Sequence, residues 1–277
     1  MSESPRRYGV KDQTPSVDET SRHLERLALN GFTLVDGGYT EEEQLAFADA
    51  FERGMATQVE RHGGLEAMRR IDEHNTIRAA LTVDPLFIKL ACNPRVLAIA
   101  EGIFRGTAAS GAFILNQQNG IRNPPNGERY NQAAWHRDLP YQHFVSTRPL
   151  AINALYCIEP FTPENGATWV ARGTHHQEAF PSDDVLMELA EQVPAPAGSF
   201  LVLDCMLFHS GGVNRTDRQR RAVNHVYTLP FVRQQIDLGT AMDDIASLPP
   251  ETAKLLGVGN EAVPDVASYY QRRASRL

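Results

Sequence analysis

The chain has 277 residues, of which 42% are hydrophobic and 22% are charged, the composition of an ordinary globular protein. With 27 Lys and Arg residues against 34 Asp and Glu residues, the formal net charge is −7 at pH 7. This acidic balance argues against general binding to nucleic acid or to anionic membranes. The three cysteines form no CxxC pair, which argues against a disulfide framework or a zinc ribbon.

The N-terminal residues 1–19 lack the apolar core of a secretory signal. No apolar run reaches the roughly 18–20 residues that span a bilayer. We therefore expect a cytoplasmic protein. Its expected partner is a small-molecule substrate rather than nucleic acid or a membrane, and its expected state is a monomer or a homodimer.

The first part of the chain has mainly helical periodicity. Spaced leucines predict a helix over residues 18–30, and GFTLVDGG (31–38) predicts a short strand that ends in a glycine turn. A capping-box spacing predicts a second helix over 40–61. A further amphipathic helix is expected within 85–104.

Beyond residue 109 the pattern becomes that of short strands rich in β-branched, aromatic and aliphatic residues, separated by turns such as PPNG and PENG. The predicted strands are 111–118, 150–158, 167–172, 198–208 and 222–231. Such strands after a helical region predict a mainly β protein with flanking helices, built on a double-stranded β-helix, the jelly-roll or cupin-like core.

We expect a single domain over residues 1–277. Its expected parts are a loose N-terminal segment (1–17), a helical part (18–108), a jelly-roll core (109–235) and a helical C-terminal tail (236–277).

Three side chains have the identities of a metal site: His136 and Asp138 in WHRD, and His209 in FHSGG. On an extended segment alternate side chains share a face, so His136 and Asp138 can reach one ion while Arg137 points the other way. Two imidazoles and one carboxylate are the facial triad of non-haem Fe(II) oxygenases. An HxD pair alone is weak evidence, because a surface His and Asp at a strand end give the same letters.

The arginine cluster RTDRQRR follows His209 and offers a fixed charge for a carboxylate. Its plain alternative is a solvated turn between two strands. Arg220 and Arg221 begin the next predicted strand, so they point to opposite faces and only one can enter the core. Spacing alone does not decide between them. Iron together with a captured carboxylate suggests an oxygenase that uses 2-oxoglutarate.

The motifs resemble, in the expected order, those of the phytanoyl-CoA dioxygenase family of Fe(II)- and 2-oxoglutarate-dependent oxygenases, over most of the chain. NGFTLVDGGYTEEE is similar to the start of the family pattern, WHRD to its HxD motif, ENGATWVARGTHH to its NGAT segment and FHSGGVNRTDRQRRAVNHVY to its distal block. The family implies the double-stranded β-helix fold, with Fe(II), 2-oxoglutarate and O2 as cofactor and cosubstrates.

The resemblance also implies residue roles. His136, Asp138 and His209 would be the iron ligands, and Arg220, rather than Arg221, would pair with the distal carboxylate of 2-oxoglutarate. Thr168 would place a hydroxyl near 2-oxoglutarate. Gln117, on the strand before the HxD segment, could also bind it, although Asn116 and Gln118 are neighbours and a one-residue slip exchanges the faces of a strand.

Two details refine this expectation. Many family members carry a serine two residues after the distal histidine, where it helps to hold the cosubstrate, but here that position is Gly211. One hydrogen bond to the cosubstrate is therefore missing or supplied elsewhere. The aspartate at 138, in place of glycine or alanine, argues against a halogenase, which needs that coordination position open.

The resemblance implies hydroxylation of an unactivated C–H bond with release of succinate and CO2. Desaturation, epimerisation and ring formation are alternative outcomes of the same oxidant. Candidate contacts of a polar or anionic substrate are Arg122, Arg129, Trp135, Tyr141 and His143. The rival functions are a cupin-like metalloenzyme without 2-oxoglutarate, a non-catalytic binding protein on the same fold and, less favoured by the acidic charge, a nucleic-acid demethylase.

Overall fold

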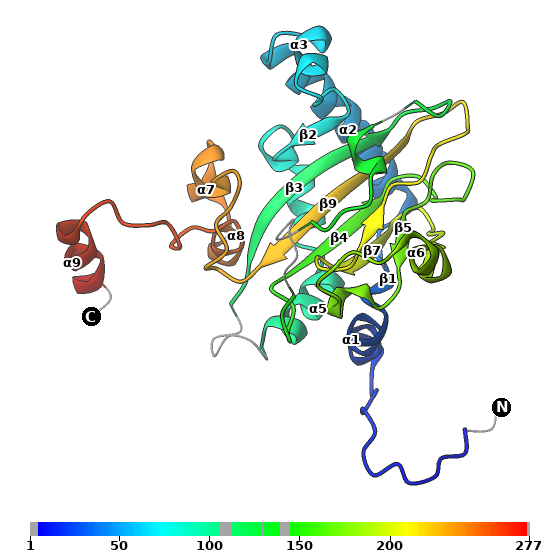
Figure 1. Ribbon diagram of the computed structural model, residues 1–277. Coiled ribbons are helices and arrows are strands. Elements are labelled where there is room, and N and C mark those ends of the chain that lie inside the picture. The colour runs from blue at the N-terminus through cyan, green and yellow to red at the C-terminus, as the bar shows by residue number, and fades with distance from the viewer. Residues whose placement is uncertain (1–4, 106–111, 129, 139–144, 276–277) are drawn as a thin grey trace.

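The computed structural model describes residues 5–105, 112–128, 130–138 and 145–275. Two antiparallel sheets form its centre (Figure 1). The larger sheet has the strand order β1 (Phe32–Asp36), β7 (Ser199–Asp204), β4 (Ala151–Cys157), β9 (Arg220–Thr228), β3 (Ile114–Asn123) and β2 (Thr76–Arg78). The smaller sheet has the order β6 (Ala190–Gln192), β5 (Trp169–Ala171) and β8 (His209–Ser210).

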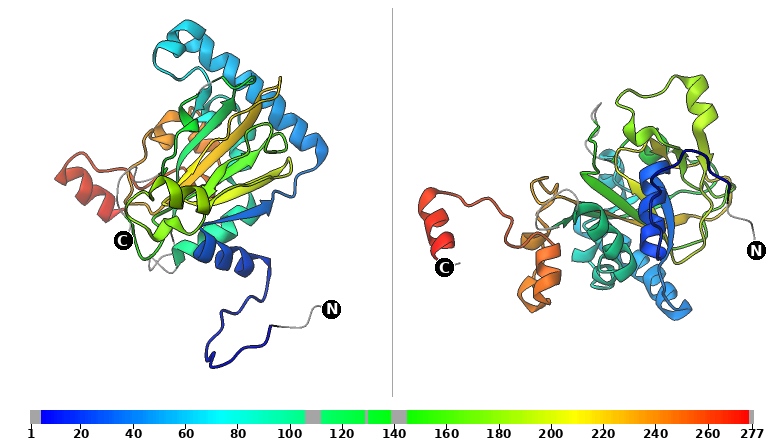
Figure 2. Two further views of the ribbon diagram at one scale, coloured as in Figure 1. Left: turned by 45° about the vertical axis from the view of Figure 1, so that its right-hand side comes forward. Right: turned by 90° about the horizontal axis from the view of Figure 1, so that it is seen from below.

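Helices precede, connect and follow the strands. The α-helices are α1 (Glu19–Asn30), α2 (Glu41–Arg61), α3 (Leu65–Arg70), α4 (Leu86–Ala91), α5 (Pro94–Arg105), α6 (Asp183–Leu189), α7 (Leu238–Ala241), α8 (Pro250–Leu255) and α9 (Val266–Ala274). Short 3-10 turns are η1 (Ala80–Thr82), η2 (Asn131–Ala133), η3 (Thr174–His176) and η4 (Ile245–Ser247). Figures 1 and 2 show α9 at the end of an extended segment, apart from both sheets.

The alternation of side chains along β4 separates the two cores. Ile152, Ala154 and Tyr156 pack into the core that the larger sheet shares with the N-terminal helices. Leu155 and Cys157 point to the other face and join the core between the sheets. All these side chains are buried, which is why the strand is apolar at nearly every position. Asn153 is the polar exception on the inter-sheet face, and it belongs to the site described below.

These sheets confirm the predicted fold class, mainly antiparallel β with flanking helices. The two sheets remain separate, however, so the core is an open sandwich rather than a closed barrel. The helix expected within 85–104 is two helices, because Pro94 begins α5 and Asn93 caps it through its Oδ1. Of the part of the chain that the structure describes, no helix is both long and apolar enough to cross a membrane.

One predicted strand ends earlier than expected. The run 198–208 stops at Asp204, whose Oδ1 accepts a 2.9 Å hydrogen bond from the amide of Met206. The chain turns there and crosses to the smaller sheet, where His209 begins β8. An unbroken strand over 198–208 would have placed His209 directly at its end, but the structure places His209 on the smaller sheet instead.

Candidate metal centre

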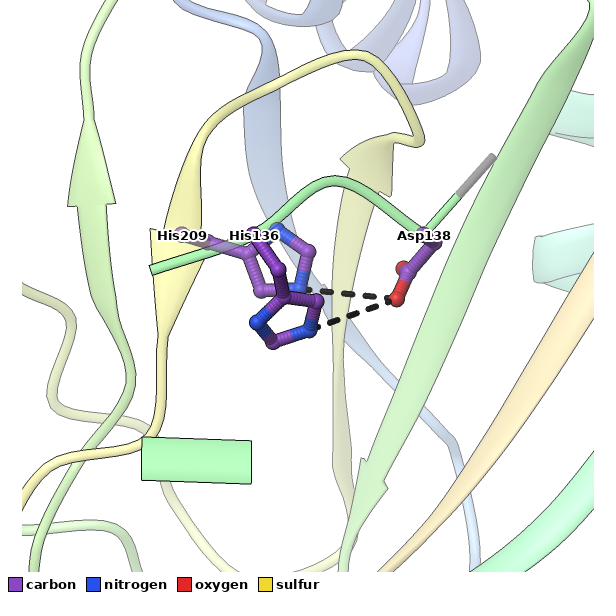
Figure 3. A group of neighbouring side chains, drawn as sticks. All are labelled: His136, Asp138 and His209. Atoms are coloured by element: carbon purple, nitrogen blue, oxygen red, sulfur yellow. Dashed lines mark ion pairs between the residues drawn. The ribbon is translucent and has the colours of Figure 1, made fainter. Parts of the chain in front are cut away.

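The structure brings His136, Asp138 and His209 together (Figure 3). The Nε2 atoms of His136 and His209 lie 3.7 and 3.6 Å from Oδ1 of Asp138. One ligand atom from each residue lies within 4.8 Å of the others, although the three come from two separate segments. The convergence of two imidazoles and a carboxylate is the arrangement expected of a metal centre.

Backbone pairing holds the two segments in place. His136 and His209 form an isolated antiparallel bridge, with N–O distances of 2.9 and 3.0 Å between their main chains. The amide of Asp138 donates to the carbonyl of Cys205. The turn after β7 and the first residue of β8 therefore fix the HxD segment at both ends.

Each histidine is held with Nε2 directed into the site. The Nδ1 atom of His136 lies 2.7 Å from the carbonyl oxygen of Ala134, and the Nδ1 atom of His209 lies 3.0 Å from that of Leu207. A carbonyl can only accept, so Nδ1 carries the proton and Nε2 presents its lone pair. Burial lowers the pKa of His209 below its ordinary 6.5, although the negative charge of Asp138 acts in the opposite direction. The lowered pKa favours the neutral imidazole that a metal needs.

A cavity adjoins the three ligands and reaches Arg220. Its lining includes all three ligands together with Tyr130, Gln132, Asn153, Leu155, Thr168, Leu203, Gly211, Arg220, Asn224 and Ile121. Polar groups that converge within an otherwise apolar wall are typical of ligand-binding sites.

The two neighbouring arginines have opposite surroundings. Arg220 is 3% exposed, faces the cavity, and donates from Nη2 to the carbonyl of Gly166 at 3.0 Å. Its guanidinium lies 4.1 Å from the ring centroid of Phe161. Arg221 points to the other face of β9 and pairs with Glu52 and Glu159. This confirms that only one of them enters the core, and the structure identifies it as Arg220.

Among the residues that the structure describes, Arg220 has no carboxylate partner, and its Nε atom has no hydrogen-bond acceptor. A buried cation without a counter-charge is costly unless a ligand supplies one. The cavity is therefore suited to an anion.

The NGAT turn carries Thr168 into the same cavity. Thr162 and Asn165 cap one another through side-chain to backbone hydrogen bonds of 2.8 and 3.3 Å. Gly166 follows with φ +80°, where a Cβ would lie 2.3 Å from the carbonyl oxygen of Gly212, so glycine is required there. This tight turn brings the carbonyl of Gly166 to Arg220 and places Thr168, 4% exposed, in the cavity lining.

Gln117 is placed less favourably than the other predicted residues. A β-bulge between Leu115 and Gln117 resets the register of β3, and Gln117 lies on the same face as Ile121, which lines the cavity. Gln117 does not line it, and its Oε1 accepts a 3.4 Å hydrogen bond from Asn119. Its role in binding 2-oxoglutarate stays a prediction.

The candidate substrate contacts divide into two groups. Arg122 is held away from the cavity by Asn75 Oδ1 and the carbonyl of His74, at 3.0 and 2.8 Å. Trp135 packs edge-on against Phe180. Arg129, Tyr141 and His143 lie outside the residues that the structure describes.

Sequence reasoning missed several residues of the site. Asn153 donates from Nδ2 to Oδ2 of Asp138 at 2.7 Å. The sequence could have indicated Asn153, because it is an asparagine within the otherwise apolar run LAINALYCI. Tyr130 enters the cavity from the loop before the HxD segment, and its phenol oxygen lies 3.5 Å from Nη2 of Arg220. No spacing rule pointed to Tyr130.

The chain is similar to known proteins in sequence and in fold. The family model described as phytanoyl-CoA dioxygenase (PhyH) matches residues 27–222. An uncharacterized protein of Mycobacterium tuberculosis is 32% identical over 258 residues, which cover 90% of this chain and 92% of that protein.

Two solved structures share the fold. EctD from S. alaskensis, solved with 2-oxoglutarate and 5-hydroxyectoine, gives a TM-score of 0.62 at 20% identity, covering 82% of this chain and 81% of its own. SnoN, a non-heme alpha ketoglutarate dependent epimerase from nogalamycin biosynthesis, gives a TM-score of 0.55 at 22% identity, covering 76% and 80%. The family match confirms the predicted class of enzyme, an Fe(II)- and 2-oxoglutarate-dependent dioxygenase. With a family model over most of its length and a relative matched along nearly all of it, the chain belongs to the phytanoyl-CoA dioxygenase (PhyH) family.

Proposed function

We propose that this enzyme holds Fe(II) through His136, Asp138 and His209 and binds 2-oxoglutarate through Arg220, and that it hydroxylates an unactivated C–H bond of a small polar or anionic metabolite. The observation that carries the proposal is one cavity that contains both the three converging ligand atoms and a buried arginine with no carboxylate partner among the described residues. Balanced, the reaction converts substrate R–H, O2 and 2-oxoglutarate into R–OH, succinate and CO2.

The donor set fits iron. Two neutral imidazoles and a carboxylate on one face suit non-haem Fe(II), and they leave the remaining coordination positions to other ligands. Both Nδ1 atoms are engaged by backbone carbonyls, so only the Nε2 atoms are free to coordinate. The Oδ2 atom of Asp138 is engaged by Asn153, which leaves Oδ1 for the metal.

The protein's own residues would bind and orient the reactants and would exclude water from the site. When bound, Fe(II) and 2-oxoglutarate supply the reductive activation of O2 and the oxidising power for C–H cleavage. Arg220 would hold the distal carboxylate of 2-oxoglutarate through a charge-assisted pair, with Thr168 as a neighbouring hydroxyl. Leu155 and Leu203 line the same cavity with hydrocarbon, which would keep bulk water from the reacting centre.

The nature of the substrate follows from the polar groups that these roles leave unused. Gln132 and Asn224 also line the cavity, and their amides could hydrogen-bond a polar substrate. We therefore propose a small-molecule substrate. A cytoplasmic location for the enzyme is a separate proposal that these contacts do not test. Epimerisation is a second candidate outcome, because SnoN, with the same fold, is an epimerase by its own description.

The test is an anaerobic titration of the metal-free protein with Fe(II) and then 2-oxoglutarate, followed by visible spectroscopy for the metal-to-ligand charge-transfer band. We expect a band that is lost in His209→Ala and weakened in Arg220→Ala. If Fe(II) binds but no band develops at any 2-oxoglutarate concentration, the cosubstrate is wrong and a cupin-like metalloenzyme without 2-oxoglutarate becomes the better account. If His136→Ala and Asp138→Ala bind Fe(II) like the parent, the metal lies elsewhere.

A further inference from the structure

Tyr130 brings a hydroxyl to the end of the cavity where Arg220 lies. Its side chain is 6% exposed, and its phenol oxygen accepts a long hydrogen bond, 3.5 Å, from Nη2 of Arg220. An arginine can only donate, so this contact uses the oxygen of the phenol and leaves its proton free. Among the described residues, none accepts a hydrogen bond from Tyr130. A buried O–H without an acceptor is uncommon in a folded protein.

Gly211 is the reason that the phenol fits. A Cβ at this position would lie 1.8 Å from the phenol oxygen of Tyr130 and 2.8 Å from its Cζ. Gly211 does not have a positive φ, so its backbone does not require glycine. Space alone requires it: the aromatic ring occupies the volume that any side chain at 211 would take.

Arg220 presents a second unused donor beside this hydroxyl. Its Nε–H is buried and has no partner among the described residues, and Tyr130 and Arg220 both line the cavity. Burial raises the pKa of Tyr130 above its ordinary value of 10 despite the opposing attraction of Arg220, so the phenol is protonated at neutral pH. Two buried donors without acceptors therefore face one end of a single cavity.

We infer that Tyr130 is a binding residue for the distal carboxylate of 2-oxoglutarate, donating its phenol hydrogen alongside the Arg220 guanidinium, and that Gly211 provides the space for it. This rests on the proposed function. The pairing gives the carboxylate a neutral donor and a charged donor from different segments, the loop before the HxD motif and the start of β9. Tyr130 thus supplies the hydrogen bond that a side chain at position 211 cannot supply.

The experiment measures the affinity of the Fe(II)-loaded protein for two 2-oxo acids by anaerobic titration of the charge-transfer band. One is 2-oxoglutarate, and the other is 2-oxopentanoate, which has a methyl group in place of the distal carboxylate. Tyr130→Phe keeps the ring and removes only the donor. We expect this variant to lower the affinity for 2-oxoglutarate by about 10- to 100-fold, the loss typical of a hydrogen bond to a charged group. The affinity for 2-oxopentanoate should be unchanged.

The matched control is Tyr227→Phe, which removes another buried phenol hydroxyl, one that donates to the carbonyl of Ala91 at 2.8 Å. It should lower the thermal stability without changing the affinity for either 2-oxo acid. Fe(II) affinity without 2-oxo acid, measured by competition with a chelator, should be the same in the parent and in both variants. If Tyr130 has a purely structural role, Tyr130→Phe should lower the affinity for both 2-oxo acids alike, and that result would overturn the inference.

A second variant tests the role of Gly211. Gly211→Ala should expel the Tyr130 ring and weaken 2-oxoglutarate at least as much as Tyr130→Phe. In a Tyr130→Ala background, Gly211→Ala should lower the 2-oxoglutarate affinity little further, because the phenol that its Cβ would overlap is absent. Unchanged affinity in Gly211→Ala, or fully additive losses, would contradict the inference. If the parent itself develops no band, the proposed cosubstrate fails and this inference fails with it. If the parent binds 2-oxoglutarate and Tyr130→Phe binds it equally well, only the inference fails.

Discussion

Asn153 donates a 2.7 Å hydrogen bond from Nδ2 to Oδ2 of Asp138, and this bond selects which carboxylate oxygen faces the histidines. The other oxygen, Oδ1, is the one nearest to Nε2 of both His136 and His209. Asn153 lies on β4, in the middle of the larger sheet, whereas Asp138 lies on a loop segment. A strand inside the larger sheet thereby orients a candidate metal ligand that lies on a loop segment.

Asn153→Ala should therefore weaken metal binding more than it weakens the fold. We expect about 10- to 100-fold lower Fe(II) affinity, the usual loss when a hydrogen bond that orients a metal ligand is removed. Asn116→Ala is the matched control, since Asn116 is also a buried asparagine but donates to the carbonyls of Val232 and Arg233. Anaerobic Fe(II) titrations of both variants check this, and equal affinities would contradict it.

Substitution of Arg220 should affect cosubstrate binding, whereas substitution of Arg221 should affect stability. Arg220→Met removes a buried cation that has no carboxylate partner in the described part of the chain, so stability in the absence of ligand should be unchanged or higher, while 2-oxoglutarate affinity should fall by roughly 100-fold or more. Arg221→Met breaks the ion pairs with Glu52 and Glu159, and we expect a loss of about 2 kcal/mol in the free energy of unfolding with unchanged 2-oxoglutarate affinity. Urea unfolding and the charge-transfer titration together check both variants, and the reverse pattern would refute the assignment.

Arg137 should couple the HxD segment to the distal histidine. It is 2% exposed, and it donates from Nε to the carbonyl of Met206 at 2.7 Å and from Nη1 to that of Glu178 at 3.0 Å. Its guanidinium carbon lies 3.9 Å from the ring centroid of Phe208, the residue before His209. Arg137 therefore ties both ligand-bearing segments to the same interior contacts.

Arg137→Met and Arg137→Lys should each lower the free energy of unfolding by about 3 kcal/mol, because several buried carbonyls lose a charged donor. Lysine should not rescue, because it lacks the planar fork. Both Arg137 variants should also bind Fe(II) more weakly than the parent. Arg172→Met, which breaks the exposed ion pair with Glu191, is the control and should cost less than about 1 kcal/mol. Retention of both properties by the lysine variant would show that charge alone suffices.

The sequence predicted the local part of the candidate metal site better than the long-range part. The alternation rule placed His136 and Asp138 on one face because two residues of one extended segment are involved. The prediction of an unbroken strand over 198–208, directly before His209, was wrong, because the turn at Asp204 depends on a side-chain cap within an apolar run. The choice between Arg220 and Arg221 depends on the pairing of β9 with β3 and β4, which no spacing within β9 reveals.

Other parts of the site depend on contacts between distant segments. Tyr130 reaches Arg220 only because the loop before the HxD motif folds over the cavity, and Gly211 accommodates it from a third segment. The open sandwich likewise reflects strand pairings rather than the hydrophobic pattern, which is the same for a sandwich and a closed barrel.

His225 should make the fold sensitive to mild acid. The ring is fully buried on β9, its Nδ1 atom lies 2.9 Å from the carbonyl oxygen of Ala154, and its Nε2 has no partner among the described residues. Burial lowers the pKa of His225 to about 4 from 6.5. Between these values the unfolded chain binds more protons than the folded chain at this position, so stability falls as the pH is lowered from 6.5 toward 4.

Relative to the variant His225→Asn, which keeps a donor for Ala154 but does not titrate, the parent should lose about 2 kcal/mol of unfolding free energy between pH 8 and pH 5. Urea unfolding of both proteins across this range measures the difference. Comparing the two cancels other groups, such as Asp204, whose pKa burial raises to about 6 and whose effect on stability has the opposite sign. Parallel curves for parent and variant would mean that His225 is protonated as readily in the folded chain as in the unfolded one, and that water or a rearranged acceptor reaches its Nε2.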